Sequence, residues 1–246
     1  MEGDKLTNEN NKKVMIIIAH PDDGEFGAGG TLAKWAREGF EIYYTLCTSG
    51  DKGTSDPKIT ASELTATRET EQQNAANVIG AKGVAFLRHT DGELNNNESL
   101  RQDISREIRR IKPDIVICQD PTNRFGDNHI NHPDHRAAGD AALDCIYPSA
   151  RDYHAFPQLI NEGFMPHNVL EVYLTGPGGS TPTVIDISST IEVKINALLE
   201  HRSQVGADNP ERVEMLISRV KERANNLGKE FGVEYAEIFR YIALGR

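Results

Sequence analysis

The amino-acid sequence predicts an α/β fold in which a mostly parallel sheet is covered by helices on both faces. Short apolar runs alternate with segments of helical period through the first half of the chain, which is the order that a parallel sheet requires. The first run, residues 14–18 (VMIII), is continuously apolar. Such a run is typical of a strand buried on both faces.

The elements of the first half are separated by clear end signals. Gly39 and Gly80 follow the first two predicted helices and Pro113 follows the third, as expected of residues that end helices. In parallel sheets, ligands bind beyond the carboxyl ends of the strands. The loops after residues 18, 47 and 118 should therefore meet at one edge. The predicted strands are 14–18, 41–47, 84–87 and 115–118, and the predicted helices are 31–38, 63–79 and 100–111.

The second half of the chain has weaker patterns. We expect residues 1–13, which are polar and aperiodic, to form a disordered tail. Residues 14–246 contain no internal repeat and no low-complexity linker, which favours a single domain. The second half is predicted to contain a helix at 135–145, an irregular segment at 147–168, strands at 169–174 and 183–187, and helices at 191–204 and 211–227, the last one highly charged.

The composition is globular and acidic. Lys and Arg number 27 against 37 Asp and Glu, a formal net charge of −10, which argues against a nucleic-acid partner. Cys47, Cys118 and Cys145 are too few for a disulfide framework, so a reducing compartment is expected. No apolar stretch approaches the roughly 18 residues of a membrane span, and the first 13 residues lack a secretory signal. We expect a cytoplasmic protein with no membrane partner.

Two compact clusters of imidazole and carboxylate follow predicted strands. Residues 19–23 read AHPDD, and residues 131–135 read NHPDH at the start of a predicted helix. A catalytic zinc typically has three protein ligands and an open fourth position, whereas a structural zinc is usually closed by cysteines. Because neither cluster contains cysteine, the pair favours a catalytic metal, with the remaining carboxylates and histidine free for proton transfer.

A structural explanation competes with this one. A lone His-Pro-Asp triplet is most often a turn whose Asp caps the next helix. Two such triplets, each after a buried strand and each followed by a further Asp or His, are harder to explain in that way. The residues alone do not tell which of Asp22 and Asp23 binds a metal.

A glycine-rich segment follows the first cluster and partly resembles a dinucleotide-binding loop. Its glycines, at positions 24, 27, 29 and 30, do not fit the spacing G-x-G-x-x-G. The bulky pair Glu25 and Phe26 also stands where the backbone would approach a phosphate. We therefore expect these glycines to allow a sharp turn and close helix packing around the cluster.

The two clusters together resemble the hallmarks of the LmbE-like, or PIG-L-type, de-N-acetylase family, an AHPDD near the N-terminus and an HPDH in mid-chain. Similar counterparts lie at residues 68–76 (RETEQQNAA), 91–94 (DGEL), 112–114 (KPD) and 201–204 (HRSQ), so the resemblance covers residues 14 to 206. It implies a Rossmann-like three-layer fold and a zinc ion or another divalent metal. It also implies hydrolysis of the acetamide of N-acetylglucosaminyl compounds, and self-association into a homo-oligomer.

Carried over by motif position, the resemblance implies that His20, Asp23 and His135 are the metal ligands. Asp22 would be the general base that takes a proton from the metal-bound water. Zinc lowers the pKa of its water to about 7, which makes this step accessible near neutral pH.

The same correspondence gives roles to four further side chains. His132 would stabilise the oxyanion or protonate the departing amine, a step that a poor amide leaving group requires. Asp134 would orient His132 and hold its charge. Arg68 and Asp91 would bind sugar hydroxyls.

Two alternative functions stay open. One is a metal-dependent amidase that cleaves a different amide, as in a sugar-thiol conjugate. The other is a non-catalytic sugar-binding protein on the same fold, which is disfavoured because Asp22 and His132 are both present.

The sequence leaves the aglycone open among inositol, malate, a second sugar and an antibiotic, because loops set specificity on a fixed scaffold. Asn131 stands where other members of the family often have Gly or a basic residue. His129, Asp51 and Asp120 lie close to the predicted site without an assigned role. We take the remaining histidines at 154, 167 and 201 as structural or surface residues, and His89 as ambiguous.

Overall fold

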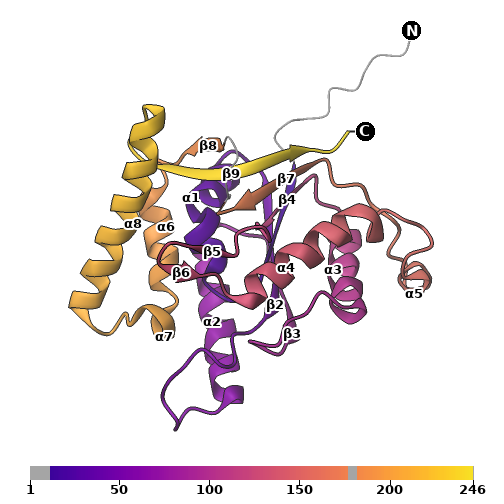
Figure 1. Ribbon diagram of the computed structural model, residues 1–246, viewed down its shortest axis with the longest axis horizontal. Coiled ribbons are helices and arrows are strands. Elements are labelled where there is room, and N and C mark those ends of the chain that lie inside the picture. Colours follow the sequence, from indigo (N-terminus) through magenta and orange to yellow (C-terminus); the bar gives the residue numbers. More distant parts are fainter. Residues whose placement is uncertain (1–11, 177–181, 246) are drawn as a thin grey trace.

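The computed structural model describes residues 12–176 and 182–245. Its centre is a seven-stranded sheet in the order β3-β2-β1-β4-β7-β9-β8 (Figure 1). The first five strands in this order are parallel, and β9 runs antiparallel to both β7 and β8. The predicted mostly parallel sheet is confirmed. The strands are β1 (Lys13–Ile18), β2 (Glu41–Thr48), β3 (Gly83–His89), β4 (Ile115–Gln119), β7 (Glu171–Thr175), β8 (Thr183–Asp186) and β9 (Ala236–Ala243).

Helices cover both faces of this sheet (Figure 1). Helices α1 and α2 pack on one face with α6 against both, and α3 and α4 pack on the opposite face. Helix α8 lies outside α6 and contacts β9. The helices are α1 (Asp23–Arg37), α2 (Ala61–Ile79), α3 (Glu98–Ile111), α4 (Pro133–Asp144), α5 (Pro157–Asn161), α6 (Ile191–Leu199), α7 (Arg202–Val205) and α8 (Pro210–Phe231).

The continuously apolar first strand divides its side chains between the two faces. Val14, Ile16 and Ile18 pack with residues of α1 and α2, whereas Met15 and Ile17 pack with residues of α3 and α4. All five are at most 1% exposed. This two-sided burial is the reason why β1 lacks the polar alternation of a strand with one solvent face.

Strand order places a ligand-binding crevice at the ends of β1 and β4. The chain runs from β1 to β2 and β3 on one side, and then returns to place β4 on the other side of β1. Ligands of open α/β sheets bind where the strand order reverses in this way. The loops that leave β1 and β4 carry the two His-Pro-Asp clusters, so the fold brings both clusters to that crevice.

The glycine-rich segment differs from the sequence prediction. It is helical, because α1 begins at Asp23 and not at residue 31. A Cβ on Gly30 would lie 2.7 Å from Ile187 Cδ1, and one on Gly24 would lie 2.9 Å from Tyr44 Cε1. The expected sharp turn is therefore wrong, while the expected close packing is correct. Because a Cβ at position 30 would collide with Ile187, which is far away in the sequence, glycine fits this position despite its low helix propensity.

Several other elements differ from their predicted bounds. The helix predicted at 191–204 is divided into α6 and α7, which are separated by Glu200 and His201. The segment 147–168 contains the short helix α5. Strand β9 was not predicted from the sequence, nor was the small hairpin of β5 (Phe125–Gly126) and β6 (His129–Ile130).

The disordered tail predicted at the N-terminus overlaps the described residues only at Lys12 and Lys13. Of the tail expected at residues 1–13, residues 1–11 lie outside the described part of the chain. Lys13 belongs to β1, and Lys12 Nζ lies 3.0 Å from Glu171 Oε1 on β7. The sheet therefore begins earlier than predicted.

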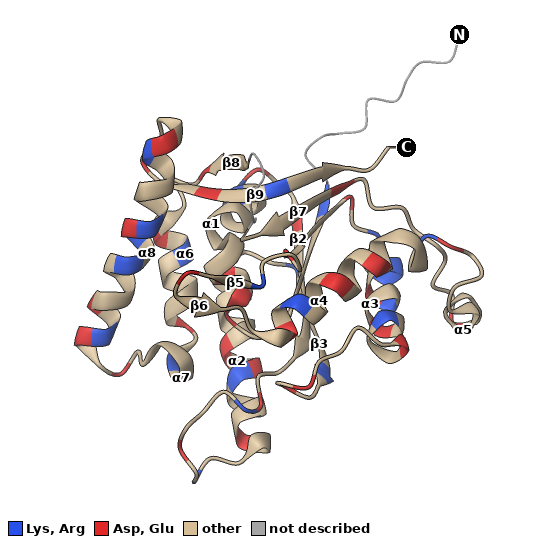
Figure 2. Cartoon of the chain, viewed as in Figure 1, with Lys and Arg blue, Asp and Glu red and all other residues tan. Residues whose placement is uncertain are grey.

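The charged helix predicted at 211–227 is α8. Its buried residues are Val220, Ala224 and Gly228, which recur every four positions and so form one stripe. Figure 2 shows acidic and basic residues mixed along this helix. The highly charged helix predicted here is confirmed, and its single buried stripe makes it amphipathic. None of the helices in the described ranges has the length and apolar character needed to cross a bilayer.

Candidate metal centre and active site

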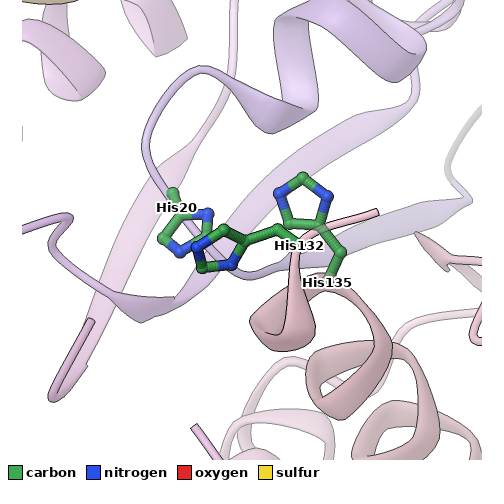
Figure 3. Close-up of side chains that lie close together, drawn as sticks. All are labelled: His20, His132 and His135. Atoms are coloured by element: carbon green, nitrogen blue, oxygen red, sulfur yellow. The ribbon is translucent and has the colours of Figure 1, made fainter. Parts of the chain in front are cut away.

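Three imidazoles from two distant parts of the chain meet at the sheet edge. His20 lies in the loop after β1, and His132 and His135 lie at the start of α4 (Figure 3). The ring centroid of His20 is 4.8 Å from that of His132 and 5.3 Å from that of His135. One nitrogen from each ring falls in a group whose members lie within 4.8 Å of one another. The predicted convergence of the two clusters is therefore present.

Asp23 joins two of these imidazoles through a single carboxylate. Its Oδ2 lies 3.2 Å from His20 Nδ1, and its Oδ1 lies 3.1 Å from His135 Nε2. Burial alone would raise the pKa of Asp23, but hydrogen bonds with His135 and His20 outweigh it and hold the pKa well below its usual range. A charged carboxylate between two imidazoles is a donor set that fits zinc or a similar divalent ion.

His20 is surrounded by acidic groups on both sides of its ring. Its Nε2 lies 3.1 Å from Asp91 Oδ1 and 3.3 Å from Asp134 Oδ2. Burial alone would lower the pKa of His20, but hydrogen bonds with Asp134, Asp23 and Asp91 raise it to about 11. The carboxylates thus stabilise positive charge at this position. A bound divalent cation would supply such a charge. His20, Asp91 and Asp134 form a second group with ligand atoms within 4.8 Å.

Asp22 has partners different from those of its neighbour Asp23. Its backbone is left-handed, with a φ of 89°, and it immediately precedes α1. Its Oδ2 lies 3.5 Å from Arg68 Nη2. Burial and the adjacent charge of Asp23 raise the pKa of Asp22 to about 7. A carboxyl group whose pKa lies near neutrality suits a general base.

The side chain of His132 is positioned by the backbone of α4. His132 is the N-cap residue, and its Nδ1 accepts a hydrogen bond from the backbone N–H of Asp134 at 3.2 Å. This contact places the proton of a neutral His132 ring on Nε2. Burial and the nearby charge of His20 lower the pKa of His132.

The carboxylate of Asp134 has contacts that differ from the expected one. It accepts hydrogen bonds from the backbone N–H groups of Gly92 at 2.7 Å and Leu94 at 3.2 Å, and it contacts His20. These bonds hold the loop that carries Asp91 against the ring of His20. Asp134 meets His132 through its backbone N–H, so the carboxylate orients His20 in this structure.

Arg68 is fixed between the two loops that border the site. It is 4% exposed, and its guanidinium donates to the carbonyl oxygens of Pro21 at 2.7 Å and Gly50 at 3.1 Å. Gly50 has a φ of 67°, and a Cβ there would collide with the guanidinium of Arg68. The prediction that Arg68 enters the site is consistent with this position, although its guanidinium also binds backbone.

These side chains surround one small cavity of about 260 Å³. Every predicted site residue except Asp134 lines it, and Gly53 completes the wall. A larger cavity of about 590 Å³ lies between α1, α8 and β9 and includes Phe26 and His129 in its wall. The lining of the small cavity is His20, Asp22, Asp23, Gly53, Arg68, Asp91, His132 and His135.

Sequence reasoning missed a buried polar chain behind Asp22. The backbone N–H of Asp22 donates to Gln72 Oε1 at 3.3 Å, and Gln72 Nε2 donates to Glu25 Oε1 at 3.0 Å. Glu25 Oε2 in turn lies 3.1 Å from His201 Nε2. Gln72, Glu25 and His201 are all 0% exposed. The one local signal was the position of Gln72 four residues after Arg68, which places both on the same face of α2.

The residues without an assigned role support loops or other elements. Asp51 Oδ1 accepts a hydrogen bond from the backbone N–H of Asp91 at 3.0 Å. Asp120 accepts from the backbone and the hydroxyl of Thr122. His89 Nε2 lies 3.1 Å from Asp103 Oδ2, and His89 is outside the cavity lining.

Comparisons with known proteins identify a family and several similar proteins. The family model described as "PIG-L: GlcNAc-PI de-N-acetylase" matches residues 15–146. The chain is 33% identical to the diacetylchitobiose deacetylase of Thermococcus kodakarensis, over 94% of this chain and 83% of that protein. It is 28% identical to a probable N-acetyl-alpha-D-glucosaminyl L-malate deacetylase 2 of Bacillus subtilis, over 78% and 82%. The solved N,N′-diacetylchitobiose deacetylase of Pyrococcus horikoshii superposes with a TM-score of 0.84 at 31% identity, covering 94% and 84%.

Proposed function

Because this chain belongs to the PIG-L family of de-N-acetylases, we propose that it hydrolyses the acetamide of an N-acetylglucosamine-containing small molecule. The two His-Pro-Asp clusters predicted membership of that family, and the family match confirms it. Two of the similar proteins are named for deacetylation of diacetylchitobiose, and a third for an N-acetylglucosaminyl malate. These names favour release of acetate over release of a larger acid.

The proposed metal ligands are His20, Asp23 and His135. The observation that carries the proposal is the Asp23 carboxylate, whose two oxygens contact one nitrogen each of His20 and His135. When bound, a divalent metal such as zinc acidifies water and polarises the carbonyl of the scissile amide. The three side chains line the small cavity, and three protein ligands beside a cavity suit a catalytic site better than a closed structural one.

The proton transfers are assigned to Asp22 and His132. Asp22 takes a proton from the attacking water, which is supported by its pKa of about 7 and its position in the cavity wall. His132 faces the same cavity, where its Nε2–H stabilises the oxyanion or passes to the departing amine and is replaced by the proton that Asp22 has taken from water. Asp134 supports both histidines, His132 through its backbone N–H and His20 through its carboxylate.

The sugar is proposed to contact Arg68 and Asp91. Both line the cavity that contains the proposed metal ligands, and so lie where the hydroxyl groups next to the acetamide would arrive. We propose a second sugar as the aglycone, because the protein named for diacetylchitobiose aligns with 94% of this chain at 33% identity. The protein is proposed to work in the cytoplasm and to self-associate.

An acetate-release screen tests the proposal. The purified protein is incubated with diacetylchitobiose and with N-acetylglucosaminyl conjugates of inositol and malate, and both acetate and the free amine are measured. We expect stoichiometric acetate and amine, loss of both after treatment with a chelator, and recovery after re-addition of zinc. Turnover that persists after the metal has been removed, or the absence of turnover on every substrate with zinc present, would overturn the proposal.

A further inference from the structure

The proposed metal ligand His135 has a partner on the side of its ring that faces away from Asp23. His135 Nδ1 lies 2.9 Å from Oδ1 of Asn131, four residues earlier in the chain. His135 Nε2 lies 3.1 Å from Asp23 Oδ1. The imidazole is therefore held from both of its nitrogen atoms, one by the amide of Asn131 and the other by the proposed metal site.

The amide of Asn131 can take only one orientation. Its Nδ2 lies 2.6 Å from the carbonyl oxygen of Asn123 and donates to it. Exchange of the amide oxygen and nitrogen would place two acceptor oxygens at that distance, which is repulsive. Oδ1 must therefore be the atom that faces His135, and Oδ1 can only accept. The hydrogen of a neutral His135 ring then lies on Nδ1, and Nε2 keeps its lone pair.

The backbone of Asn131 is held as firmly as its side chain. Its N–H donates to the carbonyl oxygen of Arg124 at 2.9 Å, and its carbonyl oxygen accepts from Arg136 Nη1 at 2.7 Å. These bonds connect the segment that leaves the β5–β6 hairpin to the first turn of α4. Asn131 is thus a fixed acceptor that does not depend on the rotamer of a long side chain.

We propose that Asn131 is a positioning residue that selects the Nδ1–H tautomer of His135 and so directs the Nε2 lone pair of this ligand toward the metal. The inference rests on the proposed metal site and gives a role to a residue that departs from the family pattern. Partners of this kind on metal-binding histidines fix the ring and its tautomer, and their loss typically weakens metal affinity by about 10–100-fold.

Two substitutions at this position separate tautomer selection from simple support of the hairpin. Asn131→Ala removes both the acceptor for His135 and the donor to Asn123. Asn131→Asp keeps an acceptor for His135 but removes the donor to Asn123. A role in supporting the hairpin predicts that both variants weaken metal binding alike, whereas tautomer selection predicts rescue by Asp.

The main readout is the zinc dissociation constant of the metal-free protein, measured by competition with a chromophoric chelator. We expect Asn131→Ala to bind zinc about 10–100-fold more weakly than the wild type, and Asn131→Asp to stay within about threefold of it. Asn209→Ala is the matched control, because Asn209 is exposed, caps α8 with its side chain and is not part of the cavity lining. Its zinc affinity should equal that of the wild type, and the melting temperature of each metal-free variant reports whether it is folded.

A second readout observes the tautomer directly. Long-range ¹H–¹⁵N correlation spectra of the zinc-loaded protein should show His135 with its proton on Nδ1 and none on Nε2 in the wild type, and a mixture of the two arrangements in Asn131→Ala. The zinc-loaded form is used because in the metal-free protein the Asp23 carboxylate also attracts a proton to Nε2. Zinc affinity of Asn131→Ala equal to the wild type, equal weakening in both variants, or a zinc-loaded wild-type ring protonated on Nε2 would each overturn the inference. Zinc binding by the wild type together with an unaffected Asn131→Ala leaves the proposed function intact, whereas a wild type that binds no zinc overturns both.

Discussion

Asp22 and Asp23 are neighbours in the chain, but their carboxyl groups have different partners and oppositely shifted pKa values. Burial and the charge of Asp23 raise the pKa of Asp22 to about 7, whereas contacts with His135 and His20 lower the pKa of Asp23. Two carboxyl groups whose environments separate their pKa values are a common arrangement in acid–base catalysis. In this site the difference in pKa favours Asp22 as the proposed base and Asp23 as the proposed metal ligand. The sequence alone did not tell which of the two binds the metal.

The first prediction concerns the base. Asp22→Asn should keep its metal, because none of the proposed ligands is changed, and should lose turnover by about 10²–10⁴-fold, the range for loss of a general base. Metal content, measured by mass spectrometry, checks that the metal is kept, and kcat for acetate release checks the loss of turnover. Asp56→Asn, in an exposed position, is the control and should behave as the wild type. Near-native turnover in Asp22→Asn would remove Asp22 from the role of base.

The second prediction concerns a ligand. His135→Ala removes one of the two imidazoles that contact the Asp23 carboxylate, so the variant should lose both its metal and its activity. His154→Ala changes an exposed histidine and should keep both. The measurement is zinc content after dialysis against a low concentration of chelator. Full zinc occupancy in His135→Ala would contradict the ligand assignment.

Much of this site was predictable because its signals are local. The apolar runs of β1 and β4 and the glycine at the end of α2 lie within a few residues of the features they indicate. A general rule about the carboxyl ends of parallel strands then brings His20 and His135 together without any knowledge of side-chain packing. The structure places their rings 5.3 Å apart.

The contacts that were not predicted depend on residues far apart in the sequence. The family resemblance implied that Asp134 orients His132, but its carboxylate bonds to Gly92 and to His20 across the crevice. Nothing in the sequence near residue 134 carries that information. In the same way, Glu25 lies in a glycine-rich segment but is buried against His201, 176 residues later. Such partners follow from tertiary packing alone.

The third prediction tests why the segment after Asp23 is glycine-rich. In an exposed helix, Gly→Ala stabilises by about 1 kcal/mol. A Cβ on Gly30 would lie within 2.9 Å of three atoms of Ile187, which is 0% exposed, and overpacking of that kind costs about 1–3 kcal/mol. We expect Gly30→Ala to lower the free energy of unfolding, as measured by urea denaturation. Gly83→Ala, whose Cβ would meet Tyr43 at an ordinary 3.5 Å, is the control. Stabilisation by Gly30→Ala would show that the helix propensity outweighs the contact.

The fourth prediction concerns the buried pair of His201 and Glu25 behind Asp22. Burial alone would lower the pKa of His201, but its hydrogen bond with Glu25 outweighs this and raises it above the ordinary value of 6.5. A histidine with a raised pKa in the folded state adds stability that is complete below the unfolded pKa and is lost as the pH rises through the folded pKa.

The cost of His201→Gln to the stability of the metal-free protein should therefore be greatest near pH 6 and should fall as the pH rises. The measurement is the difference in free energy of unfolding between wild type and variant in urea, at a series of pH values from 6 to 9. Groups that titrate independently of His201 cancel in this difference. Asp22 does not cancel completely, because the charge of His201 lowers its pKa, so the difference reports His201 together with this coupling. A cost that stays constant across this range would mean that the folded protein does not favour the protonated ring, and that Glu25 and His201 pair without a change in the pKa of His201.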